Sequence, residues 1–148
     1  MRLKFNLKSI FAIIAAVLIM PFMAMAATSN PSPGSPGYMV MPVHISGQYA
    51  ASTTAVMKLK LPFPAAVVHV SATARASGGT SPTLTVDVQE AGATILSAPI
   101  SITAGTVSDG TISDSNLADE SLITINLAIG GTSPTWNDIT VLLVLKRL

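Results

Sequence analysis

Apolar and polar residues alternate with a period of two along most of the chain beyond residue 40. Because successive side chains of a β-strand point to opposite faces, this alternation predicts strands that are buried on one side. The expected inward-facing residues are Met41, Val43 and Ile45; Met57, Leu59 and Leu61; Val68, Val70, Ala72 and Ala74; Leu84, Val86 and Val88; Ile100 and Ile102; Ile123, Ile125 and Leu127; and Ile139, Val141, Leu143 and Leu145. A weaker strand is expected near residues 106–112, and Pro42 places the first strand at the edge of a sheet.

About eight short strands, separated by clusters of Gly, Pro, Ser and Asp, are typical of an all-β fold. No segment beyond residue 26 has the 3.6-residue period of an amphipathic helix. We therefore expect a single antiparallel β-sandwich or barrel over residues 40–148.

The hexapeptide GGTSPT occurs twice, at residues 78–83 and 130–135. Each copy lies between two alternating apolar runs, which predicts that each is the loop of a β-hairpin. Gly supplies a positive φ and Pro interrupts the strand ladder, so the same residues suit the same turn. The first hairpin would pair residues 67–76 with 84–90, and the second 122–129 with 139–145, with the two hairpins side by side.

The last strand is apolar on both faces, because Leu142 and Val144 alternate with its inward-facing residues. A strand with one solvated face is expected to be polar on that face. Either another segment of the chain or a second subunit therefore covers Leu142 and Val144. We favour a subunit contact, since exposed apolar stripes usually mark interfaces.

The first 26 residues have the pattern of a secretory signal peptide. Arg2, Lys4 and Lys8 precede a run of apolar residues from 10 to 20, and an Ala-Met-Ala sequence ends at Ala26. A basic start, a short apolar core and small residues at this spacing predict export and cleavage after Ala26. The alternative is a retained hydrophobic anchor, which would be the only contact with a membrane.

Residues 27–39 contain three Pro, three Ser and two Gly in the stretch ATSNPSPGSPG. Such a composition predicts a flexible or extended arm. A plain linker is the simpler interpretation, and an arm that docks on a neighbouring subunit is the alternative.

Composition excludes several classes of function. The chain has 148 residues, 10% charged residues, a net charge of +1 and no cysteine, so disulfides, thiol catalysis and cysteine-based zinc sites are absent. Removal of residues 1–26 leaves five basic and seven acidic residues, which gives no basis for nucleic-acid binding.

No catalytic or metal-ligating residues stand out, and we expect no enzymatic activity and no cofactor. His44 and His69 both fall on outward positions of strands and belong to no spaced metal motif. Asp114, Asp119 and Glu120 could supply oxygen ligands for a calcium ion. Because Asp is common in turns, the presence of these residues in a loop is also explained without a metal.

Aromatic residues are few after the N-terminal segment, which bears on sugar binding. Trp136 directly follows the second GGTSPT, so it is either a core or interface anchor or, at an exposed end of the sandwich, a stacking platform for a glycan. Tyr49 is the second candidate for such a ligand-binding site.

The order of these motifs resembles a domain of bacteriophage virion structural proteins of the tail-fibre, head-fibre and minor structural type. The residues that carry the resemblance begin with LPFPAAVVHV and continue through Val86-Asp87-Val88, Gly92, Ile95, Ile102, Gly105, Asp119 with Leu122-Ile123-Thr124-Ile125, and Asp138-Ile139-Thr140-Val141. The resemblance extends over residues 43–148 and implies a jelly-roll-like β-sandwich with a structural or adhesive role and no catalytic residues. A signal peptide is unusual for such proteins, so an exported bacterial or archaeal surface protein is a competing origin.

The leading hypothesis is a non-enzymatic assembly module of a virion (fibre or capsid decoration) or of an exported surface appendage. It would act as a homo-oligomer or with other subunits through Leu142, Val144 and Trp136, and it would be extracellular, on the cell surface or in the virion. The alternative is a secreted module that binds a cell-surface glycan or receptor through Trp136 and Tyr49.

Overall fold

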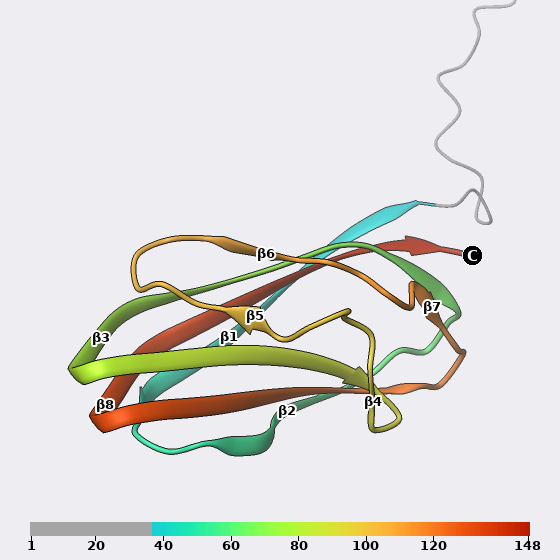
Figure 1. Cartoon of the computed structure of the whole chain (residues 1–148). Coiled ribbons are helices and arrows are strands. Elements are labelled where there is room, and N and C mark those ends of the chain that lie inside the picture. Colours follow the sequence, from blue (N-terminus) through green and yellow to red (C-terminus); the bar gives the residue numbers. More distant parts are fainter. Residues whose placement is uncertain (1–36) are drawn as a thin grey trace, which may run out of the picture. The chain divides into compact units, whose positions relative to one another are not determined.

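The computed structural model describes residues 37–148, which form an all-β fold (Figure 1). All strand pairs in it are antiparallel. The strands are β1 (Tyr38–Tyr49), β2 (Thr53–Lys60), β3 (Ala65–Glu90), β4 (Ala93–Thr94), β5 (Ile100–Ser101), β6 (Ser108–Gly110), β7 (Asn116–Leu117) and β8 (Leu122–Arg147). Within residues 37–148, no helix is long and apolar enough to cross a membrane. The expected signal peptide and nearly all of the expected arm lie outside the described residues.

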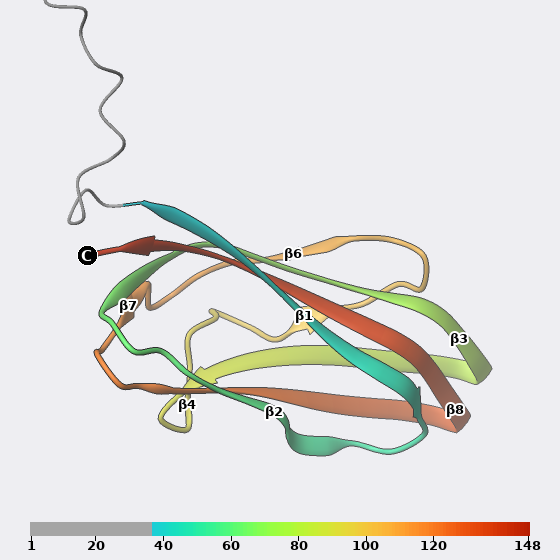
Figure 2. The same cartoon turned by 180° about the vertical axis from the view of Figure 1, so that it is seen from behind.

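Two long bent strands build both layers of the molecule. β3 and β8 each have 26 residues and pair with each other from one end to the other. Both bend in the middle, so the sheet folds over and the two halves of each strand face one another (Figures 1 and 2). Each strand thereby belongs to both layers.

The strand order in the two layers is that of a jelly roll. The first layer, here called the β1 layer, runs from β1 through the second half of β8 and the first half of β3 to β6 and β7. The second, called the β2 layer, runs from β2 through the first half of β8 and the second half of β3 to β4 and β5. The expected jelly-roll-like sandwich is therefore confirmed.

The two hairpins expected from the GGTSPT repeat are not formed. Each copy is the bend at which a long strand passes from one layer to the other, and β3 pairs with β8 rather than with itself. The two copies lie antiparallel against each other, with Gly78 opposite Thr135 and Thr83 opposite Gly130. The expected arrangement of two hairpins side by side was therefore wrong, because a turn-like sequence can bend a strand without reversing it.

The close contact between the two bends explains why they share one sequence. A Cβ on Gly79 would lie 2.8 Å from the carbonyl oxygen of Thr132, and one on Gly131 would lie 2.6 Å from that of Ser81. Both glycines have a positive φ, +97° and +112°, and the serine two positions later has a φ of 49° in each copy. Because the two bends are equivalent and lie against each other, both strands need a glycine with a positive φ at the same position of the hexapeptide.

The core lies between the two layers and consists of the inward-facing residues that alternation predicts. Val86 and Ile125 from the β2 layer and Val70, Ile139 and Val141 from the β1 layer are fully buried in it. Burial of these aliphatic side chains is the main favourable contribution to folding in a chain without disulfides.

Two details differ from the expected strands. Val68 is 47% exposed, whereas Val67 is buried, because the register of β3 shifts between Val67 and His69. Such a β-bulge moves one residue to the other face, which alternation alone does not reveal. In addition, β1 begins at Tyr38, so the sandwich starts before residue 40.

Candidate assembly surface

The outer face of the β1 layer carries apolar side chains in consecutive rows across its strands. In the register of the sheet, Val40 lies opposite Val144, and Pro42 lies opposite Leu142. Cross-strand partners in an antiparallel pair point to the same face. Val141, Leu143 and Leu145 are buried on the inner face, so Leu142 and Val144 point outward.

These residues form one exposed apolar patch. Tyr38 and Val40 are 68% and 61% exposed, Val68 is 47% exposed, and Leu142 and Val144 are half-buried between their neighbouring strands. The β1-layer patch is defined here as Tyr38, Val40, Pro42, Val68, Leu142 and Val144. The sequence-predicted interface residues Leu142 and Val144 thus lie on its central strand, β8.

The outer face of the β2 layer provides a contrast. There Lys58 lies opposite Thr124, and Thr124 lies opposite Gln89. Asp87 and Asn126 form the next row. This face is polar and suited to water, so the apolar outer face is specific to the β1 layer.

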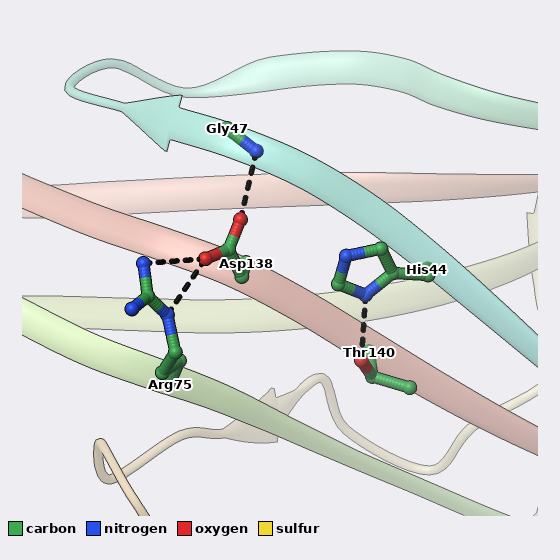
Figure 3. Close-up of polar contacts among 5 residues, drawn as sticks. All are labelled: His44, Gly47, Arg75, Asp138 and Thr140. Atoms are coloured by element: carbon green, nitrogen blue, oxygen red, sulfur yellow. Dashed lines mark hydrogen bonds and ion pairs between the residues drawn. The ribbon is translucent and has the colours of Figure 1, made fainter.

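Toward the bends, the outer face of the β1 layer becomes polar (Figure 3). Asp138 on β8 accepts hydrogen bonds from the backbone N–H of Gly47 (3.0 Å) and from Nε of Arg75 (2.7 Å). The side chains of His44 on β1 and Thr140 on β8 form a hydrogen bond of 3.0 Å. Polar contacts therefore border the patch on this side.

The carboxyl group of Asp138 has a lowered pKa. The largest cause is the hydrogen bond from the Gly47 N–H, which stabilises the charged form, and the positive charge of Arg75 acts in the same direction. Gly47 has a φ of +98° and lies where the register of β1 shifts. Asp138 therefore connects the irregular part of β1 to β3.

Pro42 stands at the free edge of the β1 layer. Arg147 N donates a hydrogen bond to Gly37 O (3.1 Å), which identifies this pair as hydrogen-bonded. Such pairs alternate along antiparallel strands, so Met39, Met41 and Val43 bond to β8, and Pro42 has its nitrogen on the outer side. The predicted edge position of Pro42 is confirmed. Its missing N–H removes no hydrogen bond between β1 and β8, and it leaves the free edge with one donor fewer.

Trp136 does not form a surface. Its side chain is 2% exposed and belongs to the core, opposite Tyr49 on β1 and Ser77 on β3. The interpretation of Trp136 as a core anchor is correct, whereas its assignments as an exposed interface residue and as a glycan-stacking residue are wrong. The second GGTSPT is a bend inside β8, so the residue after it remains within a strand and can face the interior.

The other sequence-predicted candidates are dispersed. Tyr49 is half-buried at the end of β1 and packs against the core. His69 lies 3.5 Å from Asp109, on the side of the patch away from β1. Asp114 accepts a hydrogen bond from Asn116 N, and Glu120 forms an ion pair with Lys60. Within residues 37–148, no three His, Cys, Asp or Glu side chains are grouped as metal ligands.

Sequence reasoning did not identify Tyr38, Val40, Pro42 and Val68 as members of the surface. Tyr38 was assigned to the arm, and Val68 to the interior. The available signal was the alternation of Val40 and Pro42 with the inward-facing Met41 and Val43, which continues the apolar face of Leu142 and Val144 onto β1.

Comparison with known proteins yields similarities of structure only. No protein-family model and no curated protein matches the sequence. A chain in the capsid asymmetric unit of cyanophage Pam1 is 20% identical over 87% of this chain and all of that chain, with a TM-score of 0.46. A chain in the structure of infectious bursal disease virus, Gx strain, is 12% identical over 77% of this chain and 42% of that chain, with a TM-score of 0.24. Neither similarity is close enough to place the chain in a family.

Proposed function

We propose that the chain is a non-enzymatic structural subunit that works by assembly, in a virion as a fibre or capsid-decoration component or in an exported surface appendage. The observation that carries this proposal is the β1-layer patch on a sandwich whose other outer face is polar. Contiguous exposed apolar surface is costly for a monomer in water and is typical of protein–protein contact sites. The sequence resemblance to virion structural proteins supports the same role.

A glycan- or receptor-binding role has less support. Its main candidate, Trp136, is buried among core residues, and Tyr49 is half-buried beside it. A sugar-binding site of this kind needs an exposed aromatic face. We therefore favour assembly.

Incorporation into a larger particle tests the proposed function. The full chain is produced in its own host, and the particle or appendage fraction is separated on a density gradient. Leu142→Asp places a charge on the central strand of the patch and is expected to deplete the chain from that fraction at least tenfold. Thr124→Asp places the same charge on β8 where this strand crosses the polar β2-layer face. It is expected to leave incorporation unchanged.

Thermal unfolding of both variants serves as the control for folding. A Leu142→Asp chain that folds normally and is incorporated as well as the original would contradict the proposed function. Absence of the unmodified chain from every particle or appendage fraction would contradict it as well.

A further inference from the structure

The β1 layer can join another protein through its outer face or through an edge, of which β1 is the long one, because β6 and β7 on the other side have only three and two residues. Edge pairing requires a continuous row of backbone donors and acceptors. Pro42 removes the donor in the middle of the row on β1, and the register shift between Ile45 and Gln48 distorts its far end. The edge is therefore poorly suited to strand addition, and the face is the available surface.

The centre of the face contains no charge that would oppose a second copy of itself. All six side chains of the β1-layer patch are uncharged. Two identical faces with an uncharged centre satisfy the basic requirement of an isologous contact, in which the same surface of each copy takes part. Sheets stacked face to face pack at about 10 Å with interdigitating side chains, and apolar rows suit this arrangement.

The charges on β8 are arranged with opposite signs on the two sides of Leu142. Lys146 lies four positions after Leu142, and Asp138 lies four positions before it, with both side chains on the outer face. Within residues 37–148 Lys146 has no ion-pair partner. If β8 of a second copy ran antiparallel over this strand with Leu142 at the centre, Lys146 of each copy would approach Asp138 of the other.

We propose that the outer face of the β1 layer is covered by the same face of a second copy, with the twofold axis passing over β8 at Leu142. This inference rests on the proposed function and specifies its partner. In this dimer Leu142 meets Leu142 of the second copy, and Val144 meets Thr140. Arg75 lies on the rim beside Asp138 of its own chain, and His69 and Asp109 lie there 3.5 Å from each other.

Single-cysteine crosslinking tests the position of the axis, because the chain has no cysteine of its own. In the full chain, Leu142→Cys is expected to give a covalent dimer with a short bifunctional thiol reagent, seen on a denaturing gel, because sheets stacked about 10 Å apart hold the two cysteines beyond direct disulfide distance. Val144→Cys alone is expected to remain monomeric, since the two copies of residue 144 would lie roughly 13 Å apart along the strand at about 3.3 Å per residue. The double variant Val144→Cys/Thr140→Cys is expected to crosslink.

Thr124→Cys is the matched control. It occupies a half-buried position near the start of the same strand, on the β2-layer face, and it should not crosslink. Thermal unfolding of the reduced variants verifies that each is folded. A Leu142→Cys variant that forms no more covalent dimer than the Thr124→Cys variant would overturn the proposal, as would crosslinking of Val144→Cys alone.

Lys146→Glu provides a second, independent measurement. It would place a second carboxylate beside Asp138 of the other copy, so the dissociation constant from analytical ultracentrifugation is expected to rise at least tenfold. Lys58→Glu on the β2-layer face is expected to leave it unchanged. Equal effects of the two substitutions would contradict the proposed arrangement.

The outcomes separate this inference from the proposed function. If Leu142→Asp abolishes incorporation into particles but Leu142→Cys does not crosslink, another subunit covers the patch, and the twofold dimer is wrong while the structural role stands. If Leu142→Asp also leaves incorporation intact, both are wrong.

Discussion

Asp138 combines an unusual backbone conformation with an ionic contact at one position of β8. Its φ is 49°, in the left-handed region that Asp and Asn tolerate better than most residues. Its carboxylate accepts hydrogen bonds from Gly47 on β1 and Arg75 on β3. One side chain therefore holds three strands of the β1 layer together at the polar side of the patch.

The lowered pKa of Asp138 predicts a contribution to stability that depends on pH. The contribution is fully present above the ordinary value of 3.8 and is lost as the pH falls through the lowered pKa, because the protonated group accepts a weaker hydrogen bond from the Gly47 N–H and loses its attraction to Arg75. Asp138→Asn keeps an acceptor for Gly47 and tolerates the same φ, but it carries no charge. We expect the midpoint of thermal unfolding to fall less between pH 7 and pH 3 in Asp138→Asn than in the unmodified chain.

The difference between the two midpoint curves isolates Asp138, since the other carboxyl groups are common to both proteins. Parallel curves would show that the charge of Asp138 does not stabilise the fold. Arg75→Gln removes only the ionic part of this stabilisation and keeps the hydrogen bond from Gly47, so its curve should be flattened less than that of Asp138→Asn.

At the scale of elements, the paired bends of β3 and β8 decide the architecture. A bent strand contributes to both layers, so two strands supply half of the jelly roll and set the register of all the others. The bends approach each other so closely that Gly79 and Gly131 have no room for a side chain. Glycine is required there for close approach as well as for its positive φ.

Substitution of these glycines separates the two requirements. Gly79→Ala is expected to lower the free energy of unfolding by roughly 1–3 kcal/mol more than Gly92→Ala, because it adds overpacking to the cost of a positive φ. Gly92 has a φ of +89° but nothing within 4 Å of the position a Cβ would take. Urea unfolding measures both variants, and equal losses would mean that the bends can separate to accept a methyl group.

At the scale of the whole molecule, one core is shared by two layers that cannot be separated without breaking β3 and β8. Trp136 lies in the β1 layer, and Ile125 lies in the β2 layer, both in the same buried cluster. We therefore expect the described part of the chain to unfold in one cooperative step.

This cooperativity can be tested with Trp136, the only tryptophan of the chain. Ile125→Ala is expected to lower the free energy of unfolding by about 2–5 kcal/mol, because it leaves a cavity at a fully buried position. The fluorescence of Trp136 and the far-ultraviolet circular dichroism should shift to the same lower midpoint, although the substitution lies in the other layer. Separate midpoints would show that the layers unfold independently.

The sequence by itself determined the all-β class and most of the inward-facing residues. A period of two assigns each side chain to a face, and burial of apolar surface selects the face that points inward. For the same reason it identified Leu142 and Val144 as outward-facing apolar residues. It also predicted the edge position of Pro42, because proline is excluded from the interior of a sheet.

Only the tertiary structure decided which strands pair and which residues share a surface. The alternation around GGTSPT is the same for a hairpin loop and for a bent strand. The two differ in the hydrogen bonds that the flanking residues make to distant segments, and these bonds leave no trace in the local sequence pattern. The exposure of Val68 depends on a bulge, and the burial of Trp136 depends on β8 continuing through its bend. The β1-layer patch likewise exists because β1 lies beside β8, a pairing between residues nearly a hundred positions apart that no local pattern encodes.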